Sequence, residues 1–423
     1  MNLADSEIIA GELENLGFVR ANSFEDSTII VLNTCAIRDT AEQKILGKIG
    51  SFKKWKKQSS GRILAVGGCM TAQKERAEFV AKTYPFVDIV FGTENLSNFT
   101  NMLDAFLKTG KRQIQMSPEN KTQLTKNQIR ERRVNAWVNI MHGCNNYCSY
   151  CIVPYVRGRE TSRDRNEIIS EVKSLVKGGY KQITLLGQNV NSYGNDNPEK
   201  FGDFSSLLKE LDEIQGDFRI RFMSSHPKDL SEELVKTIAD SKHICHGIHL
   251  PVQSGSTSVL KLMNRKYTRE DYIKKIQMIR NVLPDCEITS DVIVGFPGET
   301  EEDFEETISL AKEVKFISLF MFVYSRRKGT VADKMEQIDE SVKKDRIKRL
   351  ISAENKIAAE VAKSLVGKTL RLLIEGYDEK EDAYVGMTDS AKAVFVKSND
   401  NIIGKFINAK ITKSVGSKLF ANA

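Results

Sequence analysis

Three cysteines within eight residues are the feature that most constrains this chain. Cys144, Cys148 and Cys151 directly follow the apolar segment 136–141, whose composition predicts a strand. Three residues and then two residues separate the thiols, and Gly143 relaxes the backbone just before the first of them. A loop this tight can turn three thiolates toward one point. We therefore interpret it as a metal-binding loop at the end of a strand.

The type of metal site follows from the number of thiols. Thiolates are the ligands of iron–sulfur clusters, and a 4Fe–4S cluster normally takes four. With no fourth cysteine close behind, one iron would stay open for a small molecule. A structural zinc site needs four closed ligands, and the nearby His142 lies on the wrong side of Gly143. A disulfide with a spare thiol does not suit a chain without export signals. The spacing therefore favours an iron–sulfur cluster.

The segment 143–158 around the three cysteines resembles the methylthiotransferases among the radical S-adenosylmethionine enzymes. This resemblance covers essentially the whole chain. It implies a 4Fe–4S cluster on those cysteines, S-adenosylmethionine bound to it, and a 5′-deoxyadenosyl radical as the reactive species. Residues 185–193 and 221–227 look like the branch that methylthiolates carbon 2 of N6-isopentenyladenosine next to the tRNA anticodon. The alternatives are branches that act on threonylcarbamoyladenosine in tRNA or on an aspartate of a ribosomal protein.

Length and hydrophobic pattern predict three α/β or β domains. Residues 1–107 predict a doubly wound parallel α/β domain, although it opens on a helix where such a domain normally opens on a strand. The polar residues 108–133 are expected to form a basic linker. Residues 134–365 predict an open partial (β/α)6 barrel of the radical S-adenosylmethionine type, and 366–423 a small β-barrel at the place of the family's RNA-binding TRAM domain. The six strands expected in the partial barrel lie at 136–141, 182–187, 219–223, 247–250, 287–294 and 317–323.

One candidate cofactor contact is the glycine-rich turn that contains Gly295, Pro297 and Glu299. It follows an apolar strand, and a glycine at such a position permits close backbone approach to a ligand. The resemblance places the adenine of S-adenosylmethionine against this strand end. An ordinary turn between a strand and a helix is the alternative.

A second candidate contact is formed by the amides of Gln188 and Asn189, at another predicted strand end. Amides of this kind can hydrogen-bond a ribose or a base edge, so we expect them to contact the cofactor. His226 and His249 could act as ligands or acids, but we interpret them as loop or core histidines bonded to the backbone.

Cys35 and Cys69 each follow a predicted strand, so both thiols should lie at the same edge of the parallel sheet. Taken alone, two buried reduced cysteines are the default interpretation. The resemblance implies instead that they are two of the three ligands of an auxiliary 4Fe–4S cluster that delivers sulfur. The third ligand belongs to a Gly-Cys-Gln word, and this chain begins at Met1 as if cut just after it. We therefore expect two clusters in the family, an auxiliary site one ligand short here, and a further strand upstream in the natural protein.

Charge and composition limit the partners. The chain has 423 residues, of which 40% are hydrophobic, and lacks both a signal peptide pattern and an apolar run of the ~18–20 residues needed to cross a bilayer. We therefore expect a cytoplasmic protein without membrane association. Residues 108–135 carry eight Lys or Arg against two Glu, nearly the whole net charge of +7. Such runs are usually solvated faces, but beside the cluster motif we expect Arg130, Arg132 and Arg133 to contact tRNA. We also expect a monomer that is reduced by an electron carrier such as flavodoxin or ferredoxin.

Overall fold

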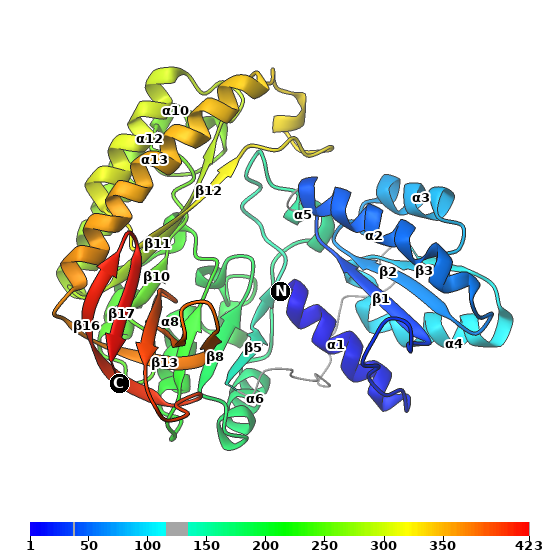
Figure 1. The fold of residues 1–423 in the computed structure, drawn as a ribbon. Helices are drawn as coiled ribbons and strands as arrows, with labels where there is room; N and C mark the ends of the chain where they lie inside the picture. The colour runs from blue at the N-terminus through cyan, green and yellow to red at the C-terminus, as the bar shows by residue number, and fades with distance from the viewer. Residues whose placement is uncertain (37–38, 116–133, 423) are drawn as a thin grey trace. The chain divides into compact units, whose positions relative to one another are not determined.

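The computed structural model describes residues 1–36, 39–115 and 134–422 (Figure 1). These residues form two compact units. The first contains the described residues up to 115 together with 142–147 and 151–161, and the second contains 134–141, 148–150 and 162–422. Arg130, Arg132 and Arg133, which are predicted to contact tRNA, lie outside the described residues. In the described part of the chain, no helix is long and apolar enough to cross a membrane.

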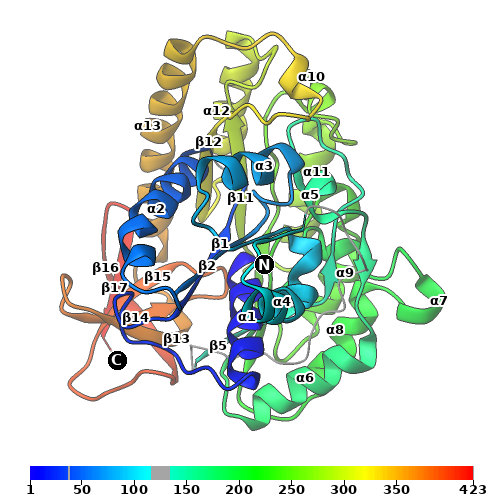
Figure 2. The same cartoon turned by 90° about the vertical axis from the view of Figure 1, so that its right-hand side faces the viewer.

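The first unit is a four-stranded parallel sheet in the order β1-β2-β3-β4, with helices on both faces (Figure 2). Its elements are α1 (Asn2–Asn15), β1 (Ile29–Thr34), α2 (Asp39–Lys57), β2 (Ile63–Gly68), α3 (Lys74–Thr83), β3 (Ile89–Phe91), η1 (Thr93–Asn98), α4 (Phe99–Thr109), β4 (Gln113–Gln115) and α5 (Val153–Arg157). On one face, Ile49, Phe52 and Val80 of α2 and α3 pack in one core cluster. On the other, Ile8 of α1 and Leu103 of α4 pack in a second. The predicted parallel α/β domain and its opening helix are confirmed.

Strand β4 corrects the predicted linker, which was expected to start at residue 108. Helix α4 continues to Thr109, and β4 then pairs in parallel with β3, with Ile89 opposite Gln113. The sequence Gln-Ile-Gln is too short for a periodic pattern, and its central Ile114 is exposed. Strand β4 therefore forms because it pairs with the edge of the sheet, and its own sequence does not predict it.

The second unit begins with an open, partial barrel of six parallel strands, in two sheets of order β5-β8-β9 and β10-β11-β12. An isolated bridge pairs Ile220 of β9 with Ile244, which precedes β10 in the chain. All six predicted strands are confirmed. The elements are β5 (Asn135–Asn139), β6 (Met141–His142), β7 (Thr161–Ser162), α6 (Arg165–Lys177), β8 (Gln182–Leu186), η2 (Val190–Ser192), α7 (Pro198–Phe201), α8 (Phe204–Asp212), β9 (Arg219–Phe222), η3 (Pro227–Asp229), α9 (Glu232–Ala239), β10 (Gly247–His249), α10 (Thr257–Leu262), α11 (Arg269–Val282), β11 (Glu287–Val294), α12 (Glu301–Val314), β12 (Ser318–Val323), η4 (Ala332–Lys334) and α13 (Glu340–Leu365).

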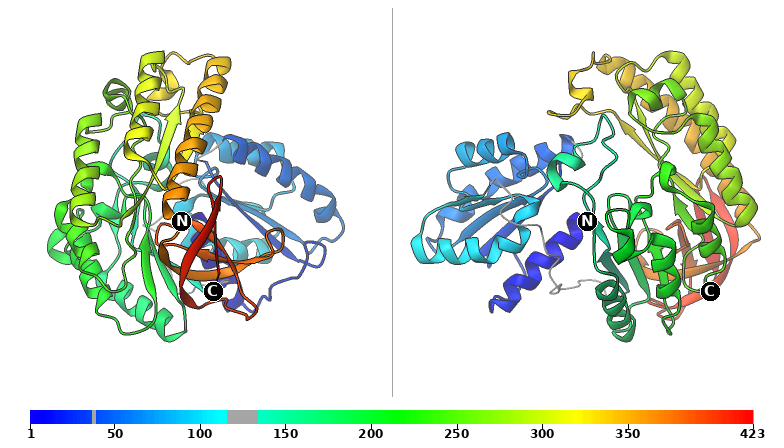
Figure 3. Two further views of the ribbon diagram at one scale, coloured as in Figure 1. Left: turned by 60° about the vertical axis from the view of Figure 1, so that its left-hand side comes forward. Right: turned by 180° about the vertical axis from the view of Figure 1, so that it is seen from behind.

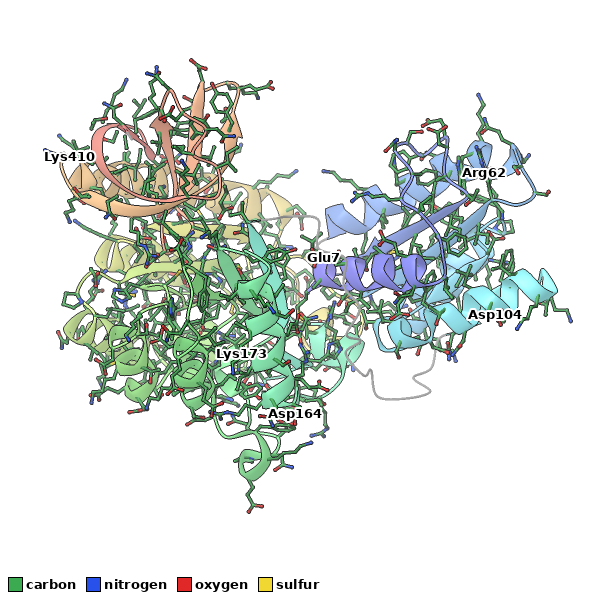
Figure 4. All side chains as sticks on the ribbon, turned by 90° about the horizontal axis from the view of Figure 1, so that it is seen from below. Glu7, Arg62, Asp104, Asp164, Lys173 and Lys410 are labelled. Carbon is green, nitrogen blue, oxygen red and sulfur yellow. The ribbon has the colours of Figure 1, made fainter. Side chains whose placement is uncertain are left out.

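The chain ends in a closed five-stranded barrel of order β13-β14-β15-β17-β16 (Figure 3). Its strands are β13 (Thr369–Asp378), β14 (Ala383–Met387), β15 (Ala393–Lys397), β16 (Phe406–Val415) and β17 (Lys418–Asn422). Leu372, Val394 and Leu419 fill its core, while Lys410 of β16 is exposed on the surface (Figure 4). The predicted small β-barrel at this end of the chain is confirmed.

This barrel is docked on the partial barrel through buried polar contacts. The fully buried Arg219 donates from Nη1 to Met387 O at 3.0 Å and from Nε to Gln182 Oε1 at 2.7 Å. Thr388 Oγ1 donates to Glu287 Oε2 at 2.6 Å. Arg219, Gln182 and Glu287 are all the first residues of their strands. The small barrel therefore sits at the amino ends of the strands and leaves their carboxyl ends for chemistry.

Candidate active site

The cysteine loop opens on Gly143, whose φ of +76° suits glycine far better than other residues. A Cβ atom at this position would lie 2.0 Å from the backbone O of Arg159. The returning segment also accepts a hydrogen bond at Gly158 O from Cys144 N, at 3.2 Å. The loop therefore needs glycine at 143 because two backbone segments pass close together there.

The three thiols of this loop have the chemistry of a 4Fe–4S site. Cys144 and Cys148 are buried, Cys151 is half-buried, and all three are free of disulfides. Cys144 and Cys151 belong to the first unit and Cys148 to the second. In number and type these donors fit three ligands of a cluster. Residues 1–36, 39–115 and 134–422 contain no group of three His, Cys, Asp or Glu side chains already arranged to hold a metal ion.

A buried arginine, which the sequence did not indicate, lies against one of these thiols. Arg265 Nη1 donates to Cys148 Sγ at 3.4 Å, and Nη2 donates to Pro251 O at 2.9 Å. Burial by itself would lower the pKa of Arg265, but Tyr267, Tyr150 and Cys148 raise it well above its usual value. The guanidinium therefore stays charged and places a fixed positive charge beside the Cys148 sulfur.

The glycine-rich turn faces mainly into its own unit. A Cβ atom on Gly295 would lie 2.5 Å from Lys343 Cγ on α13, so the glycine lets that helix approach. Glu299 Oε1 accepts a hydrogen bond from Gly295 N at 3.0 Å and from Arg346 Nη1 at 2.8 Å. Burial raises the pKa of Glu299 to about 6, against the opposing effect of these two bonds. The carboxylate thus stabilises the turn, and its contact with S-adenosylmethionine, like that of Pro297, stays a prediction.

The turn also connects to the cysteine loop. Phe296 is fully buried in a small cluster with Met263 and Tyr324, and its ring lies 6.4 Å from the ring of Tyr150 at 79°. Tyr150 lies between Cys148 and Cys151 in the sequence. A turn that packs against the cysteine loop in this way is well placed to support a cofactor bound there.

The amides after β8 do carry unsatisfied hydrogen-bonding capacity. Asn189 is 1% exposed and donates from Nδ2 to Asp229 Oδ2 at 2.7 Å. Its Oδ1 atom and the Oε1 atom of Gln188 are buried and find no partner among the described residues. Buried polar atoms are normally hydrogen-bonded, so unpaired ones at a strand end are typical of a ligand site. This supports the predicted cofactor contacts without testing them.

Cys35 and Cys69 lie where the sequence predicted, at one edge of the first sheet. Thr34 is the register partner of Gly68, so each cysteine is the next residue on one of two adjacent strands. Burial raises the pKa of Cys69, whereas Arg157 opposes that shift. Arg157 itself is buried and forms an ion pair with Asp5, with 2.6 Å between Nη2 and Oδ2. Its Nη1 atom has no hydrogen-bond partner among the described residues.

Cys245, Cys286, His226 and His249 lie outside the two cysteine sites, and their contacts differ. Burial raises the pKa of Cys245 well above its usual range and that of Cys286 to about 12. Both are therefore core thiols. His226 accepts a backbone hydrogen bond from Lys228 N at 3.1 Å, as expected, whereas His249 bonds the Thr289 side chain, so its expected backbone partner was wrong.

Three protein-family profiles match the chain. The radical SAM superfamily matches residues 138–311, the uncharacterized protein family UPF0004 matches 1–92, and the TRAM domain matches 363–423. Together they cover β1 to β3 of the first unit, most of the partial barrel with its three loop cysteines, and the terminal barrel.

Solved structures share the fold at low sequence identity. The radical S-adenosylmethionine methyltransferase TsrM from Kitasatospora setae, with cobalamin and a [4Fe–4S] cluster bound, superposes with a TM-score of 0.56 at 13% identity. The match covers 78% of this chain and 70% of that one. Such a likeness supports the architecture alone.

Relatives in sequence are much closer. A protein of Natranaerobius thermophilus is 46% identical over 99% of this chain and 94% of its own length, and one of Clostridium tetani is 47% identical over 99% and 93%. Both carry the name tRNA-2-methylthio-N(6)-dimethylallyladenosine synthase. The chain therefore belongs to the radical SAM superfamily and, within it, to the family of the tRNA-2-methylthio-N(6)-dimethylallyladenosine synthases.

Proposed function

We propose that this chain is a tRNA-modifying enzyme that methylthiolates carbon 2 of N6-dimethylallyladenosine (isopentenyladenosine) next to the anticodon. One observation carries the proposal: relatives that are 44–47% identical over 97–99% of the chain share this one name. The fold alone would not suffice, because one fold hosts many chemistries. The alternatives left by the sequence, threonylcarbamoyladenosine and a ribosomal aspartate, have no such support.

Membership of the superfamily implies an iron–sulfur cluster and S-adenosylmethionine as cofactors. Cys144, Cys148 and Cys151 would hold the 4Fe–4S cluster through their thiolates. When bound, this pair of cofactors supplies a 5′-deoxyadenosyl radical. The protein contributes a fixed cation at Arg265, which offsets thiolate charge at Cys148.

The chain's own residues then orient the cofactor and keep water away from it. Gln188 Oε1 and Asn189 Oδ1, both buried and unpaired among the described residues, would accept hydrogen bonds from the polar groups of S-adenosylmethionine. The fully buried Phe296 packs against Tyr150 and so provides apolar surface beside the cysteine loop. Excluding water in this way protects a reactive species from side reactions.

The second cluster is a finer part of the proposal. Cys35 and Cys69 would provide two ligands of an auxiliary 4Fe–4S cluster that supplies sulfur. Their positions at the ends of two paired strands support this assignment. Arg157, charged and buried beside Cys69, would balance the negative charge of such a group.

The tRNA partner follows from the family and from charge. The terminal barrel matches the TRAM domain, and we assign it tRNA binding together with Arg130, Arg132 and Arg133. A monomer reduced by a flavodoxin or ferredoxin completes the proposal.

The test uses anaerobically reconstituted full-length protein with S-adenosylmethionine, a reductant and an anticodon stem-loop RNA that carries N6-dimethylallyladenosine. Nucleosides are then analysed by mass spectrometry. We expect the 2-methylthio product from this RNA and none from a matched RNA carrying threonylcarbamoyladenosine. A product from the second RNA alone would overturn the proposal.

A further inference from the structure

One strand of the partial barrel presents an aromatic ring to solvent. Phe320 lies in the middle of β12 and is 48% exposed. Its neighbours Leu319 and Met321 point the other way, into the main core cluster under the helices. Figure 1 shows α12 and α13 running along the β11–β12 sheet on that side. Parallel sheets are normally covered on both faces. A phenyl ring exposed in the middle of a strand is therefore unusual and suggests a binding surface.

His249 and Asp291 form a polar pair beside the Phe320 ring. Asp291 of β11 is the register partner of Phe320. His249 of β10 is the register partner of Thr289, and its Nδ1 atom lies 2.9 Å from Thr289 Oγ1. His249 Nε2 is 3.5 Å from Asp291 Oδ2, and the His249 and Phe320 rings are 6.0 Å apart at 71°. The side chains of His249 and Asp291 are 14% and 27% exposed, so both can be reached by a ligand on this face.

Apolar surface continues along the same face toward the carboxyl ends of the strands. Ile293 and Phe322 are register partners, two residues beyond Asp291 and Phe320, and both are half-buried. Side chains two residues apart on a strand point to the same face. The face therefore offers a flat ring, a donor and acceptor pair beside it, and an apolar extension.

We propose that Phe320, His249 and Asp291 form the seat of the target base, an N6-dimethylallyladenine turned out of the tRNA loop. This inference rests on the proposed function. The purine would stack on the Phe320 ring, and the single N–H left on its substituted amine would donate to Asp291. The dimethylallyl group would lie against Ile293 and Phe322. A base must leave its stack before an enzyme can modify it, and an aromatic platform compensates for the stacking it loses.

A protein partner fits this surface less well. An interface for a folded protein needs a broad apolar patch with a polar rim. Here one ring is flanked at once by a histidine and a carboxylate, on the face of the sheet opposite α12 and α13. A flat heterocycle with a polar edge matches that chemistry.

The test measures binding by the full chain to an anticodon stem-loop RNA with 2-aminopurine in place of the target adenosine. A 2-aminopurine that leaves the RNA stack becomes brighter, and stacking on an aromatic ring quenches that gain. We expect quenching with the wild type and with Phe320→Tyr, and its loss with Phe320→Leu. For the stem-loop carrying N6-dimethylallyladenosine, Phe320→Leu should bind about tenfold more weakly, with an unchanged salt dependence, because it loses stacking and not a phosphate contact.

The matched control is Phe79→Leu, which removes a phenyl ring that is 43% exposed on α3. It should leave quenching and affinity unchanged. Quenching by Phe320→Leu equal to that of the wild type would overturn the base seat, as would equal loss in Phe79→Leu. These readouts are separate from the proposed function: quenching that depends on Phe320, in a protein that forms no 2-methylthio product, would support the seat and overturn the function.

Discussion

Arg157 Nη2 lies 2.6 Å from Asp5 Oδ2, and both side chains are buried in the first unit. The pair joins helix α1 to helix α5, which directly follows the last cysteine of the loop. Burial by itself would lower the pKa of Arg157, yet Asp5 and Cys69 raise it above its usual range. The ion pair therefore anchors the segment after the cysteines to helix α1. If Arg157 moved away, the Asp5 carboxylate would be left buried without a partner.

Replacing Arg157 by Met should lower the free energy of unfolding of the first unit by about 3–5 kcal/mol, because Asp5 is left buried and unpaired. The double variant Asp5→Leu/Arg157→Met should recover part of this loss. Urea unfolding in a Trp137→Phe background lets the buried Trp55 report on the first unit. The control is Lys108→Met, which breaks the exposed pair with Asp104 and should cost less than about 0.5 kcal/mol. Equal effects of the two substitutions would contradict the anchor.

The stability of the second unit should fall as the pH rises, because of Glu354 on α13. Burial raises the pKa of Glu354 to about 7, against the opposing effects of a hydrogen bond with the Leu319 backbone and the charge of Lys392. The folded state therefore holds this proton more tightly than the unfolded state does. Its stabilising effect is complete below about pH 4.5 and is lost as the pH rises to about 7, a change of roughly 3 kcal/mol.

Urea unfolding at pH 5 and pH 8 tests this linkage. The difference in unfolding free energy between the two pH values should shrink in Glu354→Gln, which cannot ionise. Glu360→Gln on the same helix, where the carboxylate is exposed, should behave like the wild type. A wild-type difference that survives unchanged in Glu354→Gln would show that other groups are responsible.

Replacing Cys144, Cys148 and Cys151 together by Ala should remove one cluster and abolish formation of 5′-deoxyadenosine. Iron content, the visible absorption of the reconstituted protein and chromatography of the S-adenosylmethionine products measure this. Cys286→Ala is the matched control, since this core thiol holds no cluster in our assignment. Undiminished 5′-deoxyadenosine from the triple variant would refute the role of the loop.

Charge reversal of Arg130, Arg132 and Arg133 to Glu should weaken tRNA binding and flatten its dependence on salt. Each lost phosphate contact should reduce the slope of log affinity against log salt by about 0.7–0.9. Filter binding at several salt concentrations gives the slope. Lys410 is exposed on the terminal barrel, which is also predicted to bind tRNA, so Lys410→Glu serves as the comparison. If affinity and slope are untouched by the triple reversal, these residues belong to a solvated linker.

Most of the fold could be predicted because buried parallel strands are continuous apolar runs. The segment 63–66, Ile-Leu-Ala-Val, has this signature, and the fully buried β2 appears there. Strand β4 has no such run, and only its pairing with β3 creates it. The docking of the terminal barrel could not be predicted either, because Arg219 bonds residues that lie 168 and 170 positions further along the chain.

The site divides in the same way. The cysteines of the loop could be identified because their spacing is local. Arg265 beside Cys148 and Arg157 beside Asp5 join positions 117 and 152 residues apart, and no local pattern indicates such partners. Glu299 resembles a ligand-facing residue, but its carboxylate bonds Gly295 N. The importance of His249 depends on strand register, which the sequence does not reveal.

Methylthiolation of dimethylallyladenosine in tRNA by this chain can be tested in the cell. The most direct measurement is mass spectrometry of tRNA nucleosides from a strain lacking this gene and from the same strain after the gene is restored. We expect 2-methylthio-N6-dimethylallyladenosine to be absent in the deletion strain and its unmethylthiolated precursor to accumulate. It should return with the wild-type gene but not with the Cys144→Ala/Cys148→Ala/Cys151→Ala variant. Normal amounts of the methylthiolated nucleoside in the deletion strain would show that another enzyme makes it, and restoration by the triple variant would show that the three cysteines are not needed.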